Sequence, residues 1–249
     1  MTDGCLEADR SVYALPDVKT GKRKELRILI LISVCFLIFH LIRCFGNNFW
    51  SDDAFTANVV KHSFSEIVDI TSTDSHSPLY YFIVKIFCEI FGYSDWTYQF
   101  SSYVPYLILM ALALTLVRRW FGIQTSLLMA IMFSVVPISV NYINEVRMYE
   151  WALMFVFILT LFAYAFCQRP SVISAAGMTV FGLAASYIHF YSMIAAGMVY
   201  LAVIVIICIG KTDLRKGLAL TFTGGTIVLI GLMPLLKKAL VYKKKIKNC

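Results

Sequence analysis

The chain has 249 residues, of which 59% are apolar and only 15% are charged, and its mean hydropathy is +0.75. This is more apolar than a soluble core requires, so the composition predicts an all-α, polytopic membrane protein. The net charge of +7 does not indicate nucleic-acid binding. The lysines and arginines cluster at the ends of apolar stretches, as topology signals do, and form no basic face on a soluble element.

Residues 1–25 are polar and basic, and the apolar stretch behind them lacks a small-residue cleavage site. We therefore expect a cytoplasmic N-terminal segment and a first span that stays in the membrane. Stretches of about twenty apolar residues predict a bundle of seven spans, which form a transmembrane module over 26–236 ahead of a basic tail, 237–249. The predicted spans lie near 26–45, 97–117, 122–141, 150–167, 172–188, 192–210 and 218–236.

One apolar segment, 79–91, holds only about thirteen residues, a length typical of interfacial or re-entrant helices. Tyr81, Lys85 and Glu89 follow one another at intervals of four, so they share one polar stripe of a helix. We expect an interfacial helix over 78–92 that lies along the outer membrane face, inside a long first outer loop, 46–96.

Charge counting supports this arrangement, since cytoplasmic loops are rich in lysine and arginine. With the N-terminus inside, Arg118, Arg119 and Arg169 fall on the cytoplasmic side, as do the basic residues near 211–216. The sequence thus predicts a multi-pass protein of the plasma membrane with its longest loop outside. The lysines of the tail contradict the scheme. An early stop in a longer ancestral chain and a last span that does not fully cross are two explanations.

On this topology, reactive and ligand-binding side chains gather on the outer side. Three outer loops contribute them, and loops that meet at the mouth of a helix bundle are a common way to build a site. The candidates are Asp52, Asp53, Asp74 and His76 from the first loop, Asn144, Glu145, Arg147 and Tyr149 from the second, and His189 and Tyr191 from the third.

Three short blocks carry a resemblance to a known family: Trp50-Ser-Asp-Asp-Ala-Phe-Thr56, Asp74-Ser-His-Ser-Pro-Leu-Tyr-Tyr81 and Asn144-Glu-Val-Arg-Met-Tyr149. They resemble the signature blocks of the integral-membrane glycosyltransferases of the C-type fold. The similarity runs from about Cys44 to Pro234. It points to the bacterial branch related to protein mannosyltransferases, lipid A aminoarabinose transferases and rhizobial lipopolysaccharide galacturonosyltransferases.

The chain also departs from the family's pattern. The first block usually reads Asp-Glu, where this chain has Asp52 and Asp53. The second block usually has two prolines after the histidine, and here Ser77 replaces the first of them. Members are commonly longer, so we expect a chain that is truncated at its C-terminus relative to them.

The resemblance implies sugar transfer on the outer face of the bacterial inner membrane. The donor is a sugar on a polyprenyl phosphate, and the acceptor is a hydroxyl group of a glycan, a lipid or a protein. Asp52 aligns with the catalytic aspartate, which acts as a base and gives inversion, while Arg147 offers a planar fork to the phosphate. The other candidates take supporting roles: His76 and Lys85 assist at the phosphate, Asp74, Tyr149 and His189 bind substrate, and Asp53 and Glu145 hold the acceptor, orient Asp52 or bind a divalent cation. The sequence does not decide whether a metal is needed.

Each candidate also has a purely structural interpretation. Asp52 and Asp53 suit the start of a helix near Ala54, where aspartate is a favoured cap. Arg147 suits a span end whose side chain reaches to the interface. His76 precedes a proline-containing run and suits a turn. His189 and Tyr191 suit the aromatic belt at the membrane boundary.

Two other functions stay open at this point. One is a catalytically inactive, truncated relative that keeps the fold, which the short length and the lysine-rich ending favour. The other is a small transporter or channel component. That function predicts ionisable residues deep within the spans, and the sequence has almost none there.

Overall fold

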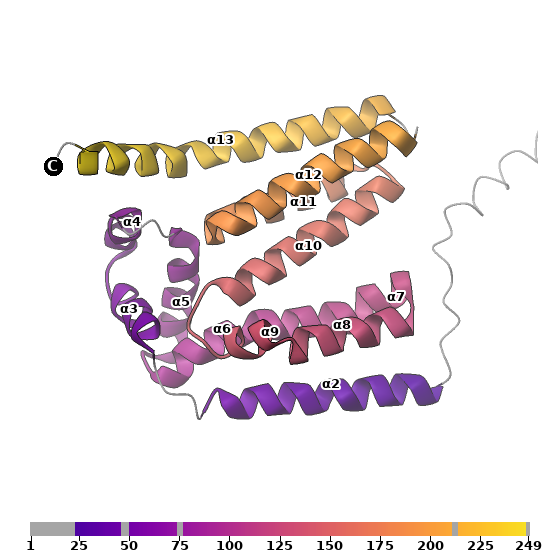
Figure 1. Cartoon of the computed structure of the whole chain (residues 1–249), viewed down its shortest axis with the longest axis horizontal. Helices are drawn as coiled ribbons and strands as arrows, with labels where there is room; N and C mark the ends of the chain where they lie inside the picture. Colours follow the sequence, from indigo (N-terminus) through magenta and orange to yellow (C-terminus); the bar gives the residue numbers. More distant parts are fainter. Residues whose placement is uncertain (1–22, 46–49, 74–76, 211–213, 248–249) are drawn as a thin grey trace, which may run out of the picture.

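The computed structural model describes residues 23–45, 50–73, 77–210 and 214–247, and within these ranges every regular element is a helix (Figure 1). This confirms the predicted all-α helical bundle. Asp74, His76 and most of the predicted cytoplasmic segment 1–25 lie outside the described residues.

Among the described residues, five helices are long and apolar enough to cross a membrane. Two of the seven predicted spans, 122–141 and 172–188, are shorter apolar helices, α8 (Ile123–Val135) and α11 (Val172–Ile188). The five long ones are α2 (Arg23–Arg43), α6 (Asp95–Leu112), which runs on through the π-helix η1 (Ala113–Val117) into α7 (Arg118–Phe121), α10 (Tyr149–Gln168), α12 (Phe190–Gly210) and α13 (Leu214–Lys247).

A proline divides the predicted span 122–141. Val136 has an extended backbone (φ −58°, ψ 127°) because the following Pro137 disfavours helical geometry before it, and α9 (Pro137–Tyr142) begins there. Because of the break, the last carbonyl groups of α8 lack the backbone amide donors that a continuous helix would supply. His40 of α2 supplies one: its Nε2 lies 3.0 Å from the Ser134 carbonyl oxygen, so this nitrogen carries the hydrogen and donates it.

Three short helices occupy the first predicted outer loop: α3 (Ser51–Val59), α4 (Phe64–Thr73) and α5 (Pro78–Phe91). They gather at one end of the bundle, and α5 runs across the direction of the long helices (Figure 1). The bounds of α5 agree with the predicted helix over 78–92. It packs against α6 and α11, while α4 packs against α5 and α13. Proline at the first position of α5 suits a helix start.

The two ends of the bundle differ in composition. The end that holds α3, α4 and α5 also holds the α9–α10 and α11–α12 connections (Figure 1). The opposite end holds α7 with Arg118 and Arg119, and the α10–α11 connection with Arg169. Helix α13 is continuous past Pro234, and its C-terminal part lies at the end that holds α4 (Figure 1). The chain therefore brings the three connections that hold the candidate site residues to one end.

Asn144 ties the α9–α10 connection to the end of α2. Its Nδ2 donates to the His40 carbonyl oxygen at 3.0 Å and to Cys44 Sγ at 2.9 Å, and the side chain is buried. Two distant segments are thus held together by one amide group in a water-poor environment.

We expect Asn144→Ala to lower the free energy of unfolding by about 1–3 kcal/mol, because two buried partners lose their donor. Thermal unfolding in detergent micelles measures this as a lower melting temperature. Asn141→Ala, which removes an exposed amide three residues earlier, is the control and changes stability by no more than about 0.5 kcal/mol. Equal melting of the two variants would show that the link does not stabilise the fold.

Candidate active site

The segment between α9 and α10 presents two charged side chains because its apolar side chains are anchored. Ile143, Val146 and Met148 are buried in the main core, while Glu145 and Arg147, which alternate with them, are partly exposed. The segment bends sharply, since the Arg147 amide donates to the Glu145 carbonyl oxygen at 2.8 Å. Burial of the apolar residues therefore directs both charges to the end of the bundle.

Asp53 fixes this segment to α3. Its side chain is 2% exposed, and its Oδ1 accepts a hydrogen bond from the Val146 amide at 2.9 Å. Its Oδ2 accepts one from the Trp50 amide at 3.1 Å, which caps the start of α3. Thr56, one turn further along α3, donates from Oγ1 to the Val146 carbonyl oxygen at 3.2 Å. The hydrogen bond from Trp50 is the one that the alternative interpretation of Asp53 as a helix cap expects, and the same carboxylate also binds a second segment.

Burial raises the pKa of the Asp53 carboxyl, and the hydrogen bonds from Trp50 and Val146 oppose that shift by stabilising the charged form. The positive charge of Arg147 acts in the same direction as these hydrogen bonds. Both oxygens of Asp53 already accept backbone hydrogen bonds, which suits a residue that holds its neighbours in place.

Asp52 points the other way and pairs with Arg147. Asp52 Oδ2 lies 3.4 Å from Arg147 Nη1, and the side chains are 65% and 14% exposed, respectively. An exposed carboxylate is thus held next to a largely buried guanidinium group. A pair with one solvent-exposed member adds little to stability, so it is free to open for a ligand.

Aromatic rings flank the guanidinium group of Arg147. Its Cζ lies 5.8 Å from the centre of the Tyr149 ring. The Tyr149 ring lies 4.2 Å from that of Tyr142 and 5.4 Å from that of His189, measured between centroids. His189 is followed by Tyr191, whose ring is 5.3 Å from the imidazole. The structure therefore brings together the predicted residues Arg147, Tyr149 and His189 from two connections.

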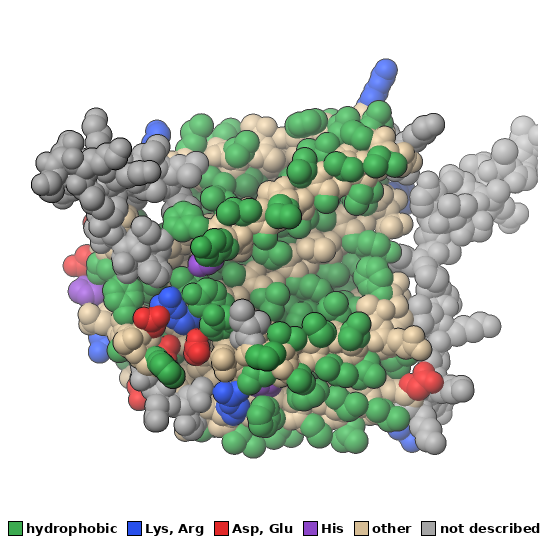
Figure 2. Space-filling model, in the orientation of Figure 1, with side chains coloured by type: hydrophobic (Ala, Val, Ile, Leu, Met, Phe, Trp, Pro, Cys, Tyr) green, Lys and Arg blue, Asp and Glu red, His purple; other side chains and the backbone are tan. Residues whose placement is uncertain are grey.

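Figure 2 shows how charged and apolar side chains are distributed over one face of the molecule. Acidic and basic side chains gather at the left end of the visible face, next to a histidine, whereas green apolar side chains cover most of the remaining face. Charged groups at the end of an apolar belt are placed where a membrane protein meets water.

Two tyrosines of α5 lie behind the charged pair formed by Asp52 and Arg147. Tyr80 and Tyr81 are each 1% exposed. Burial raises the pKa of Tyr80 well above its usual value, and the charges of Asp53 and Arg147 also reach its hydroxyl group. Tyr81 is near enough to influence the ionisation of Arg147. The first turn of α5, which follows the predicted residues Asp74 and His76 in the sequence, therefore lies behind the site.

Lys85 belongs to a different group. Its Nζ donates to Glu89 Oε1 at 2.8 Å and to the Tyr93 hydroxyl at 3.3 Å. The Glu89 carboxylate holds the pKa of Lys85 above its usual value. Lys85 and Glu89 do share the predicted polar stripe. Among the described residues, no contact joins Lys85 to Asp52 or Arg147, so the structure separates it from the main group.

The sequence also named Asp53 and Glu145 as potential ligands of a divalent cation. In the described ranges no three histidine, cysteine, aspartate or glutamate side chains are grouped closely enough to hold a metal ion. Burial raises the pKa of Glu145, and the negative charge of Asp53 raises it further. These residues therefore do not fit a metal held by protein side chains alone.

Glu150 is a buried residue near the site that the sequence did not single out. It lies in the first turn of α10 with 1% of its surface exposed, and its Oε1 has no hydrogen-bond partner among the described residues. His40 is also fully buried, at the last turn of α2. Both lie at span ends near the charged group and away from the midplane, which does not favour a transport pathway.

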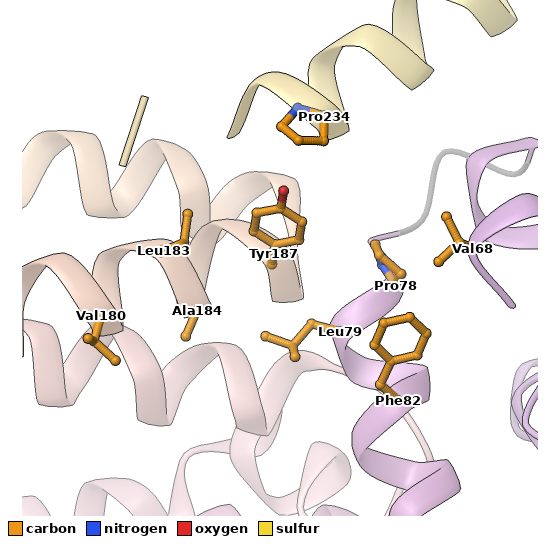
Figure 3. A pocket seen from close by; sticks show the side chains of 9 residues that line it. All are labelled: Val68, Pro78, Leu79, Phe82, Val180, Leu183, Ala184, Tyr187 and Pro234. Carbon is orange, nitrogen blue, oxygen red and sulfur yellow. The ribbon is translucent and has the colours of Figure 1, made fainter. Parts of the chain in front are cut away.

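An apolar cavity of about 430 Å³ opens on the other side of α5 (Figure 3). Leu79 lines it, whereas Tyr80 and Tyr81, the next two residues, belong to the charged site, so the two spaces lie on different faces of α5. The walls come from α4, α5, α11 and α13 and consist of Val68, Pro78, Leu79, Phe82, Val180, Leu183, Ala184, Tyr187 and Pro234. Tyr187 closes one side by donating to the Gly231 carbonyl oxygen at 2.6 Å.

We expect Asp53→Asn to destabilise the fold by about 1–3 kcal/mol, since an amide accepts at one atom and turns its NH₂ group toward the other backbone donor. Asp52→Asn is the matched control, because it changes an exposed carboxylate and costs no more than about 0.5 kcal/mol. Chemical unfolding of both variants in the same detergent measures the difference. Similar losses for the two variants would contradict the assigned roles.

Glu145 gives a prediction about pH. Folding raises the pKa of the Glu145 carboxyl above its ordinary value of 4.5. The carboxyl therefore destabilises the folded state relative to the unfolded state as the pH rises from the ordinary pKa through the raised pKa. Glu145→Gln should therefore melt at a higher temperature than the parent at pH 7 and at the same temperature at pH 4. Glu66→Gln is the opposite control, because hydrogen bonds from Ser63 lower the pKa of Glu66; it should lose stability at pH 7. A Glu145→Gln effect that does not change with pH would contradict this account.

Comparison with known proteins identifies the family. The family described as dolichyl-phosphate-mannose-protein mannosyltransferase matches residues 75–237, which is more than half of the chain. The match begins after Asp52 and Asp53 and includes the second and third outer connections. No curated protein and no solved structure matches the chain. The chain belongs to the dolichyl-phosphate-mannose-protein mannosyltransferase family, whose members are membrane glycosyltransferases that use lipid-linked sugars.

Proposed function

We propose that this chain transfers a sugar from a polyprenyl-phosphate carrier to an acceptor hydroxyl group with inversion, and that Asp52 is the base. One observation carries the proposal: an exposed carboxylate and a largely buried guanidinium group lie 3.4 Å apart at one end of the bundle. Family membership supplies the lipid-linked sugar donor. Asp52 and Arg147 are the two groups that such a reaction needs.

The chemistry follows from the two charges. The acceptor oxygen attacks the anomeric carbon and forms a new carbon–oxygen bond while Asp52 takes the proton of that hydroxyl group. The bond from the anomeric carbon to the phosphate oxygen breaks, and its electron pair leaves with the phosphate. The Arg147 guanidinium group stabilises the charge that develops there. A phosphate ester is a good leaving group, so the site needs no second carboxyl as an acid, unlike a glycosidase.

Asp52 and Arg147 are paired directly in this structure, so the substrates must separate them. An inverting displacement places the base and the leaving group on opposite faces of the anomeric carbon. The exposed side chain of Asp52 is free to rotate, while the backbone of α3 is held by Asp53 and Thr56. We assign Asp53 a positioning role and Glu145 contact with the acceptor.

The apolar cavity beside α5 is suited to the carrier's isoprenoid chain. Its volume of about 430 Å³ lies in the range of small-ligand sites, and apolar side chains line it. It adjoins Pro78, directly after Asp74 and His76, for which we keep the proposed substrate-binding roles. The proposed setting is the outer face of the bacterial inner membrane, with the N-terminus in the cytoplasm. A glycan, a lipid or a protein is the acceptor.

We expect membranes that contain the chain to transfer label from a panel of radiolabelled polyprenyl-phosphate sugars. Asp52→Asn keeps the shape of the side chain and removes the base, so transfer should fall by about 10²–10⁴-fold. Arg147→Gln should also reduce transfer strongly, because the phosphate loses its cation. Asp69→Asn, which changes an exposed carboxylate on α4, is the control and should transfer normally.

Two outcomes would contradict the proposal. Transfer that survives Asp52→Asn would remove Asp52 as the base. No transfer by the folded parent, with a panel shown to work on another family member, would favour a catalytically inactive relative.

A further inference from the structure

Four side chains form a continuous row of rings beside Arg147, which we name the aromatic shelf: Tyr142, Tyr149, His189 and Tyr191. Successive ring centroids along the row are 4.2, 5.4 and 5.3 Å apart. The Tyr191 backbone amide donates to His189 Nδ1 at 3.3 Å, which orients the imidazole relative to the Tyr191 backbone. Arg147 contacts the shelf at the Tyr149 ring.

The aromatic shelf is accessible, unlike the tyrosines behind it. Tyr191 is 77% exposed, and Tyr142, Tyr149 and His189 are partly exposed, whereas Tyr80, Tyr81 and Tyr106 are almost completely buried. Leaving a large ring in contact with water forgoes the stabilisation that its burial would give. Rings in this arrangement present an apolar surface to a ligand at the charged end of the bundle.

We propose that the aromatic shelf binds the pyranose ring of the transferred sugar by stacking against its apolar C–H face. The inference rests on the proposed function and adds a binding subsite to it. The sugar is bonded directly to the phosphate, so a phosphate held by Arg147 places the sugar ring close to Tyr149, whose ring centre lies 5.8 Å from Arg147 Cζ. The shelf extends from that point to Tyr191.

This subsite has a consequence that membrane anchoring does not share. An aromatic ring at the interface that merely anchors the protein would act equally on every lipid ligand. A ring that stacks on the sugar contributes only when the ligand carries the sugar. Comparing polyprenyl-phosphate hexose with polyprenyl phosphate separates the two roles, because the ligands share the carrier and the phosphate.

The experiment measures the affinity of the purified full chain for both ligands, by quenching of tryptophan fluorescence in detergent. Tyr191→Ala should weaken binding of the polyprenyl-phosphate hexose by about 5- to 10-fold, which corresponds to one lost aromatic contact. It should leave binding of polyprenyl phosphate unchanged. Tyr191→Phe keeps the ring and should bind both ligands like the parent. Phe91→Ala, which removes a ring that is 53% exposed at the same end, is the control and should change neither affinity.

Four results would overturn the inference. An equal loss for both ligands would make Tyr191 an anchor, and an unchanged affinity for the hexose ligand would exclude the shelf from the sugar site. If the folded parent binds polyprenyl phosphate but shows no added affinity for the hexose, the shelf is excluded while the carrier site stands. Failure of the parent to bind either ligand would reject the proposed function itself, and the inference with it.

Discussion

The site depends on the two hydrogen bonds that Asp53 accepts. One carboxylate joins the start of α3 to the Val146 amide, 93 residues away in the chain, and it does so in a buried position. Because Val146 is held in its buried position, the residues on either side of it, Glu145 and Arg147, face the end of the bundle. Because Asp53 is engaged on both oxygens, its neighbour Asp52 is the exposed carboxylate that the site presents. Neighbouring aspartates thus serve different purposes through their environments alone.

A second link, at the helix break after α8, supports the first. Pro137 interrupts the helix, and His40 supplies a donor to the Ser134 carbonyl group that the break leaves without its normal partner. Asn144 then binds the His40 carbonyl group and Cys44. The charged end of the bundle is therefore built from polar side chains of α2, α3 and the α9–α10 connection. Their hydrogen bonds are short and shielded, which gives the exposed groups a rigid base.

The all-α bundle and its long apolar helices could be predicted from the sequence because apolar length reports them directly, whereas the break at Pro137 and helix α4 were not predicted. The helix predicted over 78–92 is observed at Pro78–Phe91. Individual contacts were not accessible in the same way. The bond from Val146 to Asp53 and the burial of Glu150 both depend on how distant segments pack. A pattern within one segment carries no information about that packing.

The central claim is that Asp52 and Arg147 lie on opposite sides of the reacting carbon. The most direct measurement is a cryo-electron microscopy structure of the chain with a non-reactive polyprenyl phosphonate analogue of the sugar donor. The account predicts the phosphonate on Arg147, with the pair separated and Asp52 facing the other side of the anomeric carbon. A phosphonate bound at Lys85, with Asp52 and Arg147 still paired, would contradict it.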